Sequence, residues 1–129
     1  MPKANPFVLD KKSVYCASPY NSGPLSLADN ITNAQTLAKT AHFNNFVPVS
    51  PVENFRHLDG EVDERKILEL CIELLLSCDA LYLAPTWEGS TGARIERRVA
   101  KAARMPILSI TYEEIEEAGF KWITGPEKF

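Results

Sequence analysis

The chain has 129 residues, of which 45% are hydrophobic and 24% are charged, a balance typical of one globular domain with an apolar core. A formal net charge of −3 argues against a surface for nucleic acid, and no apolar run is long enough to cross a membrane. The three cysteines form no CxxC motif and the two histidines have no cysteine at ligand spacing, so we expect a reduced cytoplasmic protein without a metal site.

Strand-like and helix-like segments alternate along the chain after an N-terminal arm over residues 1–12. The short β-prone segments cover residues 13–18, 46–52, 79–85 and 106–110. The segments with apolar residues at helical spacing cover residues 26–45, 62–78, 92–104 and 111–119. We expect a polar loop over residues 53–61. The alternation predicts a single α/β domain over residues 13–129, a Rossmann- or flavodoxin-like three-layer sandwich with a mostly parallel sheet of about four or five strands.

Polar residues follow three of the predicted strands. Ligands of parallel sheets bind beyond the carboxyl ends of the strands, so these loops should meet at the ligand site. The loops read SPYNSG (residues 18–23), SPVENF (50–55) and TWEGST (86–91). In the first loop, Ser18, Asn21 and Ser22 can hydrogen-bond a ligand.

The third loop leads into a helix whose start is suited to an anion. Ser90 or Thr91 can cap this helix, and Gly92 lets a ligand approach the backbone. The free N–H groups of the first turn, together with the helix dipole, favour a phosphate or a carboxylate. Trp87 can stack on a base, with packing against its own domain as the equal alternative.

Helix 92–104 carries one carboxylate on its apolar side. Its basic residues gather on one face, and Glu96 falls on the other face among alanine and valine. That face should meet the sheet, close to the anion pocket. A partly desolvated carboxylate there is placed to act as a nucleophile or general base, and the alternative is a buried structural carboxylate.

Helix 62–78 is apolar over more of its circumference than one contact with a sheet requires. The apolar positions that widen its arc are Leu68, Ile72, Leu75 and Leu76. A second subunit is the cover we expect, so the sequence predicts a homodimer or larger homo-oligomer through this helix. The alternative is that the C-terminal tail folds over it.

The runs VYCASP and CDALYLAPTWEGSTGARIERRVAKA resemble the nucleoside 2-deoxyribosyltransferase-like superfamily, which includes the 2'-deoxynucleoside 5'-phosphate N-hydrolases. The likeness spans about residues 13–110. It is greatest to a DUF4406-type branch with the signature W-x-x-S-x-G-A-x-x-E, which here runs from Trp87 to Glu96.

The resemblance implies roles for individual residues. Glu96 would attack the anomeric carbon of the sugar, Ser90 would hold a 5'-phosphate, and Tyr15 would lie beside the sugar and the nucleophile. Glu73 falls where the family has an aspartate that assists the nucleophile or the leaving base, whereas periodicity places it at the polar edge of its helix. The loop after the first strand lacks the arginine of the hydrolases' phosphate loop, so a phosphate would be held less strongly or would not be required.

The sequence therefore predicts cleavage of the N-glycosidic bond of a nucleoside or nucleotide, by hydrolysis or base exchange, with Glu96 as the nucleophile. No metal or organic cofactor is implied, and the expected partners are a small nucleoside or nucleotide and further copies of the chain. The alternative is a protein that binds a nucleotide or a nucleotide-derived signal in the same pocket without turning it over.

Overall fold

The computed structural model describes residues 11–125, so the predicted N-terminal arm lies outside the described residues except for Lys11 and Lys12. Its sheet contains four strands in the order β2-β1-β3-β4, and every neighbouring pair is parallel. The strands are β1 (Ser13–Ala17), β2 (Val47–Val49), β3 (Ala80–Leu83) and β4 (Ile107–Ser109). The predicted α/β fold with a flavodoxin-like arrangement is therefore confirmed, with four strands that are all parallel.

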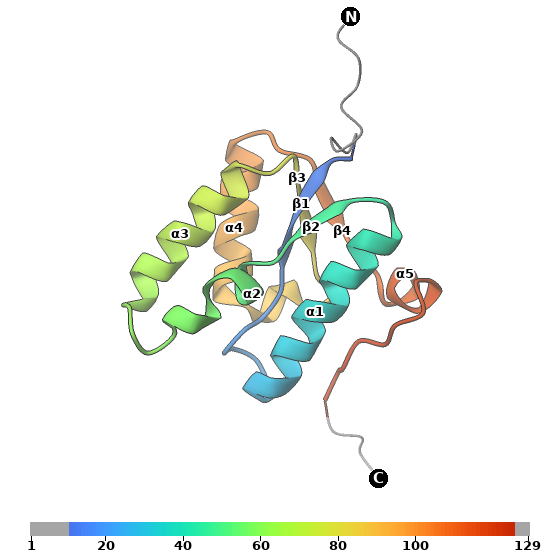
Figure 1. Cartoon of the computed structure of the whole chain (residues 1–129), viewed down its shortest axis with the longest axis horizontal. Helices are drawn as coiled ribbons and strands as arrows, with labels where there is room; N and C mark the ends of the chain where they lie inside the picture. The colour runs from blue at the N-terminus through green and yellow to red at the C-terminus, as the bar shows by residue number, and fades with distance from the viewer. Residues whose placement is uncertain (1–10, 126–129) are drawn as a thin grey trace, which may run out of the picture.

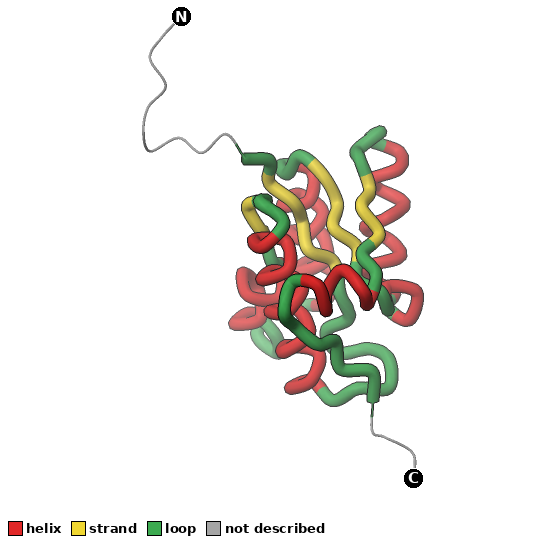
Figure 2. The backbone as a smooth tube through the Cα atoms, turned by 90° about the vertical axis from the view of Figure 1, so that its right-hand side faces the viewer, coloured by secondary structure: helices red, strands yellow, loops and turns green. Residues whose placement is uncertain are grey.

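Helices cover both faces of this sheet (Figure 1). The elements are α1 (Leu27–Phe43), α2 (Pro51–Phe55), α3 (Glu64–Leu76), α4 (Thr91–Ala102), α5 (Tyr112–Glu117) and the 3₁₀ turns η1 (Arg56–Leu58) and η2 (Trp87–Gly89). Helices α1 and α5 pack together on one face, and α3 and α4 pack together on the other. Figure 2 shows the strands running side by side in the view turned by 90°.

The core has two layers because successive side chains of a strand point to opposite faces. In β1, Val14 and Cys16 join the layer under α1 and α5, whereas Tyr15 and Ala17 join the layer under α3 and α4. Strand β3 alternates in the same way. Tyr15 therefore points towards the face that carries α4.

The predicted strand over residues 46–52 is too long, and the predicted polar loop over residues 53–61 contains helical turns. Strand β2 ends at Val49, and α2 occupies Pro51–Phe55. Ser50 caps this helix, since its side chain accepts a hydrogen bond from the backbone N–H of Glu53 at 3.4 Å. Proline at the first helical position fixes a backbone angle that suits a helix. A helix therefore begins where the prolines predict only the end of the strand.

The C-terminal segment lies against α1. Asn33 donates to the carbonyl of Ile123 at 2.9 Å and accepts from its N–H at 2.8 Å. Trp122 is buried in the core layer beside α1 and α5. The tail as far as residue 125 therefore lies on the face opposite α3 and does not cover that helix.

Helix α3 has an exposed apolar side. Leu75 is fully buried against the sheet, whereas Leu70 and Leu76 are 37% and 50% exposed. Within residues 11–125, no helix is long and apolar enough to span a membrane.

Candidate active site

A cavity of about 460 Å³ opens beyond the carboxyl ends of β1, β2 and β3. This is where a parallel sheet places its ligands, because the loops that leave neighbouring strands converge there. The walls come from β1 and the loop after it, from α2 and η1, from α3 and from the start of α4. The residues that line the cavity include Tyr15, Ser18, Tyr20, Asn21, Ser22, Pro51, Val52, Phe55, Arg56, Asp59, Glu64, Ile67, Leu68, Cys71, Ser90, Thr91, Gly92 and Glu96.

Glu96 lies at the inner wall of this cavity. Helix α4 turns Ala93, Glu96 and Ala100 towards the sheet, and all three side chains are buried. The hydroxyl of Tyr15, from the inner strand β1, donates a hydrogen bond to Glu96 Oε2. The fold therefore brings together the two residues for which the sequence predicted a shared role.

Burial sets the protonation of this pair. Desolvation raises the pKa of Glu96 from its ordinary value to about 7, although the hydrogen bond from Tyr15 lowers it. Desolvation and the nearby Glu96 raise the pKa of Tyr15 well above its usual range. At neutral pH Tyr15 is thus a neutral donor, and Glu96 exchanges readily between carboxylate and acid.

Cys71 of α3 lies on the same wall. Burial raises the pKa of its thiol to about 11, although the nearby Tyr15 hydroxyl lowers it. A thiol with this pKa stays protonated at neutral pH, and the thiolate is the form that attacks electrophiles. Cys71 therefore serves here as a neutral neighbour of Tyr15 and Glu96.

The start of α4 forms a polar part of the cavity wall. Ser90 is buried, and its Oγ accepts a hydrogen bond from the backbone N–H of Ala93 at 3.1 Å, which confirms the predicted cap. The first N–H groups of a helix have no acceptor inside it, so those of Thr91 and Gly92 are free to bind a ligand. A Cβ on Gly92 would meet only Ser90 Oγ, at 3.9 Å, so the space above this residue belongs to the cavity.

The loop after β1 lines the cavity with Ser18, Asn21 and Ser22, as predicted. Buried Asn30 of α1 holds this loop by donating to the carbonyls of Tyr20 at 2.8 Å and Ser22 at 3.3 Å. Ser18 Oγ is buried and has no hydrogen-bond partner among residues 11–125, which leaves it free for a ligand.

Two predicted site residues lie elsewhere. Glu73 is on the exposed side of α3 and does not line the cavity, in agreement with its helical periodicity. Trp87 of η2 packs on the domain, with the guanidinium of Arg97 at 5.0 Å from its ring centroid. Neither side chain therefore lines the cavity in which Tyr15 and Glu96 lie.

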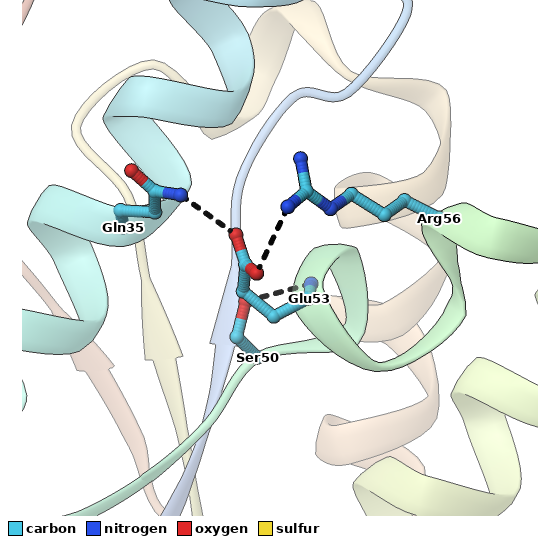
Figure 3. Close-up of polar contacts among 4 residues, drawn as sticks. All are labelled: Gln35, Ser50, Glu53 and Arg56. Atoms are coloured by element: carbon cyan, nitrogen blue, oxygen red, sulfur yellow. Dashed lines mark hydrogen bonds and ion pairs between the residues drawn. The ribbon is translucent and has the colours of Figure 1, made fainter.

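Three charged residues that line the cavity were not predicted from the sequence. Arg56 belongs to η1, and Figure 3 shows Glu53 between it and α1: Glu53 accepts from Gln35 at 3.0 Å and pairs with Arg56 at 3.5 Å. Asp59 follows η1, and Glu64 opens α3. The Ser50-Pro51-x-Glu53 pattern could have predicted α2, which Arg56 follows directly.

Two comparisons with known proteins bear on this chain. No curated protein matches it. A family model described as "Domain of unknown function (DUF4406)" matches residues 17–109, which include the last residue of β1, the loops around the cavity, Glu96 and β4. Because the match covers most of the chain, the protein belongs to the DUF4406 family.

Proposed function

We propose that the protein cleaves the N-glycosidic bond of a nucleoside or nucleotide, with Glu96 as the nucleophile, and that its family is related to the nucleoside 2-deoxyribosyltransferase-like superfamily. The observation that carries this is a buried carboxyl group that faces a ligand-sized cavity and accepts a hydrogen bond from Tyr15. A carboxylate in such surroundings is poorly solvated, which makes it reactive towards an electrophilic carbon.

The reaction takes place in two steps. A Glu96 carboxylate oxygen forms a bond to the anomeric carbon, and the bond from that carbon to the base nitrogen breaks with its electron pair leaving on the base. A proton then reaches the base nitrogen from water. In hydrolysis a water oxygen next attacks the anomeric carbon, releases Glu96 and loses a proton to the solvent; in base exchange a second base attacks instead.

The remaining site residues hold the substrate. Tyr15 orients the Glu96 carboxylate by donating to Oε2. Ser18 Oγ and the N–H groups of Thr91 and Gly92 supply donors for the hydroxyls, or for a 5'-phosphate, of the sugar. No step calls for a metal or an organic cofactor, and three free cysteines suit the reducing cytoplasm that we propose as its location.

The pH dependence of base release tests the proposal. A nucleophilic carboxylate must be ionised, so the rate should rise with pH through about 7, following the pKa of Glu96. Tyr15→Phe removes the hydrogen bond that lowers this pKa, so its profile should move to higher pH. The measurement is release of free base from a panel of ribo- and deoxyribonucleosides and their 5'-monophosphates, and a wild-type rate that is flat between about pH 5 and 9 would contradict it.

Binding without turnover is the second candidate function. The exposed position of Glu73 favours it, because Glu73 then cannot assist the nucleophile or the leaving base as the resemblance implies, and Asp59 and Glu64 line the cavity from other elements. Ligand-induced stabilisation without any base release over the same panel would identify a binding protein, since a ligand that binds only the folded state raises its stability.

The proposal includes a homo-oligomer through α3. Leu70 and Leu76 expose apolar surface on this helix, and Leu76→Glu should convert the assembly into monomers because an apolar interface rejects an unpaired charge. Leu27→Glu, at an exposed leucine of α1, is the matched control and should leave the assembly unchanged. Sedimentation of the wild type as a monomer at micromolar concentration would rule this interface out. Leu68 is unsuitable for the test because it also lines the cavity.

A further inference from the structure

The end of the cavity formed by α2, η1 and α3 differs from the end formed by α4. Its walls are apolar, and they comprise Pro51, Val52, Phe55, Ile67 and Leu68. Elements α2 and α4 follow β2 and β3, which lie on opposite sides of β1 in the sheet. A ligand centred on Tyr15 and Glu96 can therefore reach an apolar slot on one side and the N–H groups of α4 on the other.

Two side chains of opposite charge, both exposed to solvent in the free protein, also line this end. Among the described residues, Arg56 is the only lysine, arginine or histidine that lines the cavity. Its guanidinium is held by Glu53 at 3.5 Å, which occupies one edge of a group that has five donors. Asp59 lies one turn further on, and its Oδ2 accepts from the hydroxyl of Tyr20 at 3.1 Å, which leaves Oδ1 for a ligand.

The charges at this end exclude a phosphate as its preferred occupant. One guanidinium, from Arg56, is accompanied by the lining carboxylates of Asp59 and Glu64 and by its ion-pair partner Glu53, which lies outside the cavity lining. An anion placed there would face more negative than positive charge. An uncharged group that offers an acceptor to Arg56 and a donor to Asp59 meets no such repulsion, and its flat faces can lie against the apolar walls.

We propose that Arg56 and Asp59 determine specificity by binding the edge of the leaving base, and that this edge carries a carbonyl beside a ring N–H. The inference rests on the proposed function and adds the substrate class. A guanidinium fork pairs with adjacent acceptors, as it does with the O6 and N7 atoms of a 6-oxopurine. The Asp59 carboxylate accepts from the neighbouring ring N–H. In a 6-aminopurine the carbonyl is replaced by an amino group, which would set N–H against the N–H groups of Arg56.

Inosine and adenosine form a matched pair of ligands because they differ at this edge alone. Calorimetric titration of the wild type should show inosine binding about tenfold or more tightly than adenosine, since a bound base would cover Arg56 and Asp59 and adenosine would leave them unpaired. Arg56→Gln and Asp59→Asn should each bring the two affinities to within about threefold of one another. Arg65→Gln, at an exposed arginine of α3 outside the cavity, is the control and should keep the preference.

Ribose 5-phosphate and Arg56→Lys separate base binding from phosphate binding. Lysine keeps the charge but loses the fork, so Arg56→Lys should lose the preference for inosine while binding of ribose 5-phosphate stays unchanged. The inference is overturned if Arg56→Gln weakens ribose 5-phosphate and Arg56→Lys restores it, if the wild type binds inosine and adenosine equally, or if it binds neither. Base release is measured in parallel. Arg56-dependent preference without release contradicts the proposed function alone, and release with no effect of Arg56 contradicts this inference alone.

Discussion

Glu96→Gln should reduce base release by about three orders of magnitude or more while the protein remains folded. The amide keeps the shape of the side chain and can still accept the hydrogen bond from Tyr15, but it cannot form the glycosyl bond. Single-turnover measurement of free base over the nucleoside and monophosphate panel gives the rate for both proteins.

A matched control is available in the same region. Glu88→Gln, at an exposed glutamate of η2 that does not line the cavity, removes one negative charge without touching Glu96. It should keep wild-type turnover. If Glu96→Gln also turns over at a nearly normal rate, the carboxylate is not the nucleophile.

The same substitution should stabilise the protein at high pH. The folded state holds the pKa of Glu96 at about 7, above its value in the unfolded chain, so the folded state favours the protonated form. The resulting stability is complete below about pH 4.5 and is lost as the pH rises to about 7. The amide that replaces the carboxyl group carries no charge at any pH. The free energy of unfolding of the Glu96→Gln variant should therefore exceed that of the wild type at pH 8 by an amount on the order of 3 kcal/mol. Near pH 4.5 the two free energies of unfolding should be close to each other.

Urea unfolding at the two pH values measures this difference. A variant that is less stable than the wild type at the higher pH would mean that the Glu96 carboxylate holds a structural partner. If the site instead trades stability for reactivity, the Glu96→Gln variant is the more stable of the two proteins at the higher pH.

The structure of α4 could be predicted from sequence because periodicity and capping act locally. The repeat of small residues placed Glu96 on the buried face, and Ser90 indicated the helix start. The same local reasoning placed Glu73 at a polar edge, where it lies. The parallel sheet followed from the alternation of short apolar strands with helices, since parallel neighbours need a crossover between them.

The parts of the site that depend on short helices or distant contacts could not be predicted in this way. Helix α2 spans only Pro51–Phe55, which is too short for a periodic pattern. The Ser50-Pro51 capping signal marks where this helix begins, but it does not show which elements Arg56 will face. The hydrogen bonds from Tyr20 to Asp59 and from Asn21 to Glu64 join the loop after β1 to the segment after η1 and to the start of α3. No local pattern predicts which of these segments meet. The Trp87 ring packs against the guanidinium of Arg97 on α4, but the sequence around Trp87 was equally compatible with stacking on a ligand base.

The most direct test of the central claim is mass spectrometry of the wild type quenched during turnover. A 2-fluoro-substituted nucleoside, whose glycosyl-enzyme hydrolyses slowly because the fluorine destabilises the cationic transition state, would accumulate the intermediate. We predict a mass increase equal to the fluorinated sugar on the peptide that contains Glu96, absent from Glu96→Gln. Release of base with no adduct on that peptide, or with an adduct on another residue, would contradict a Glu96 nucleophile.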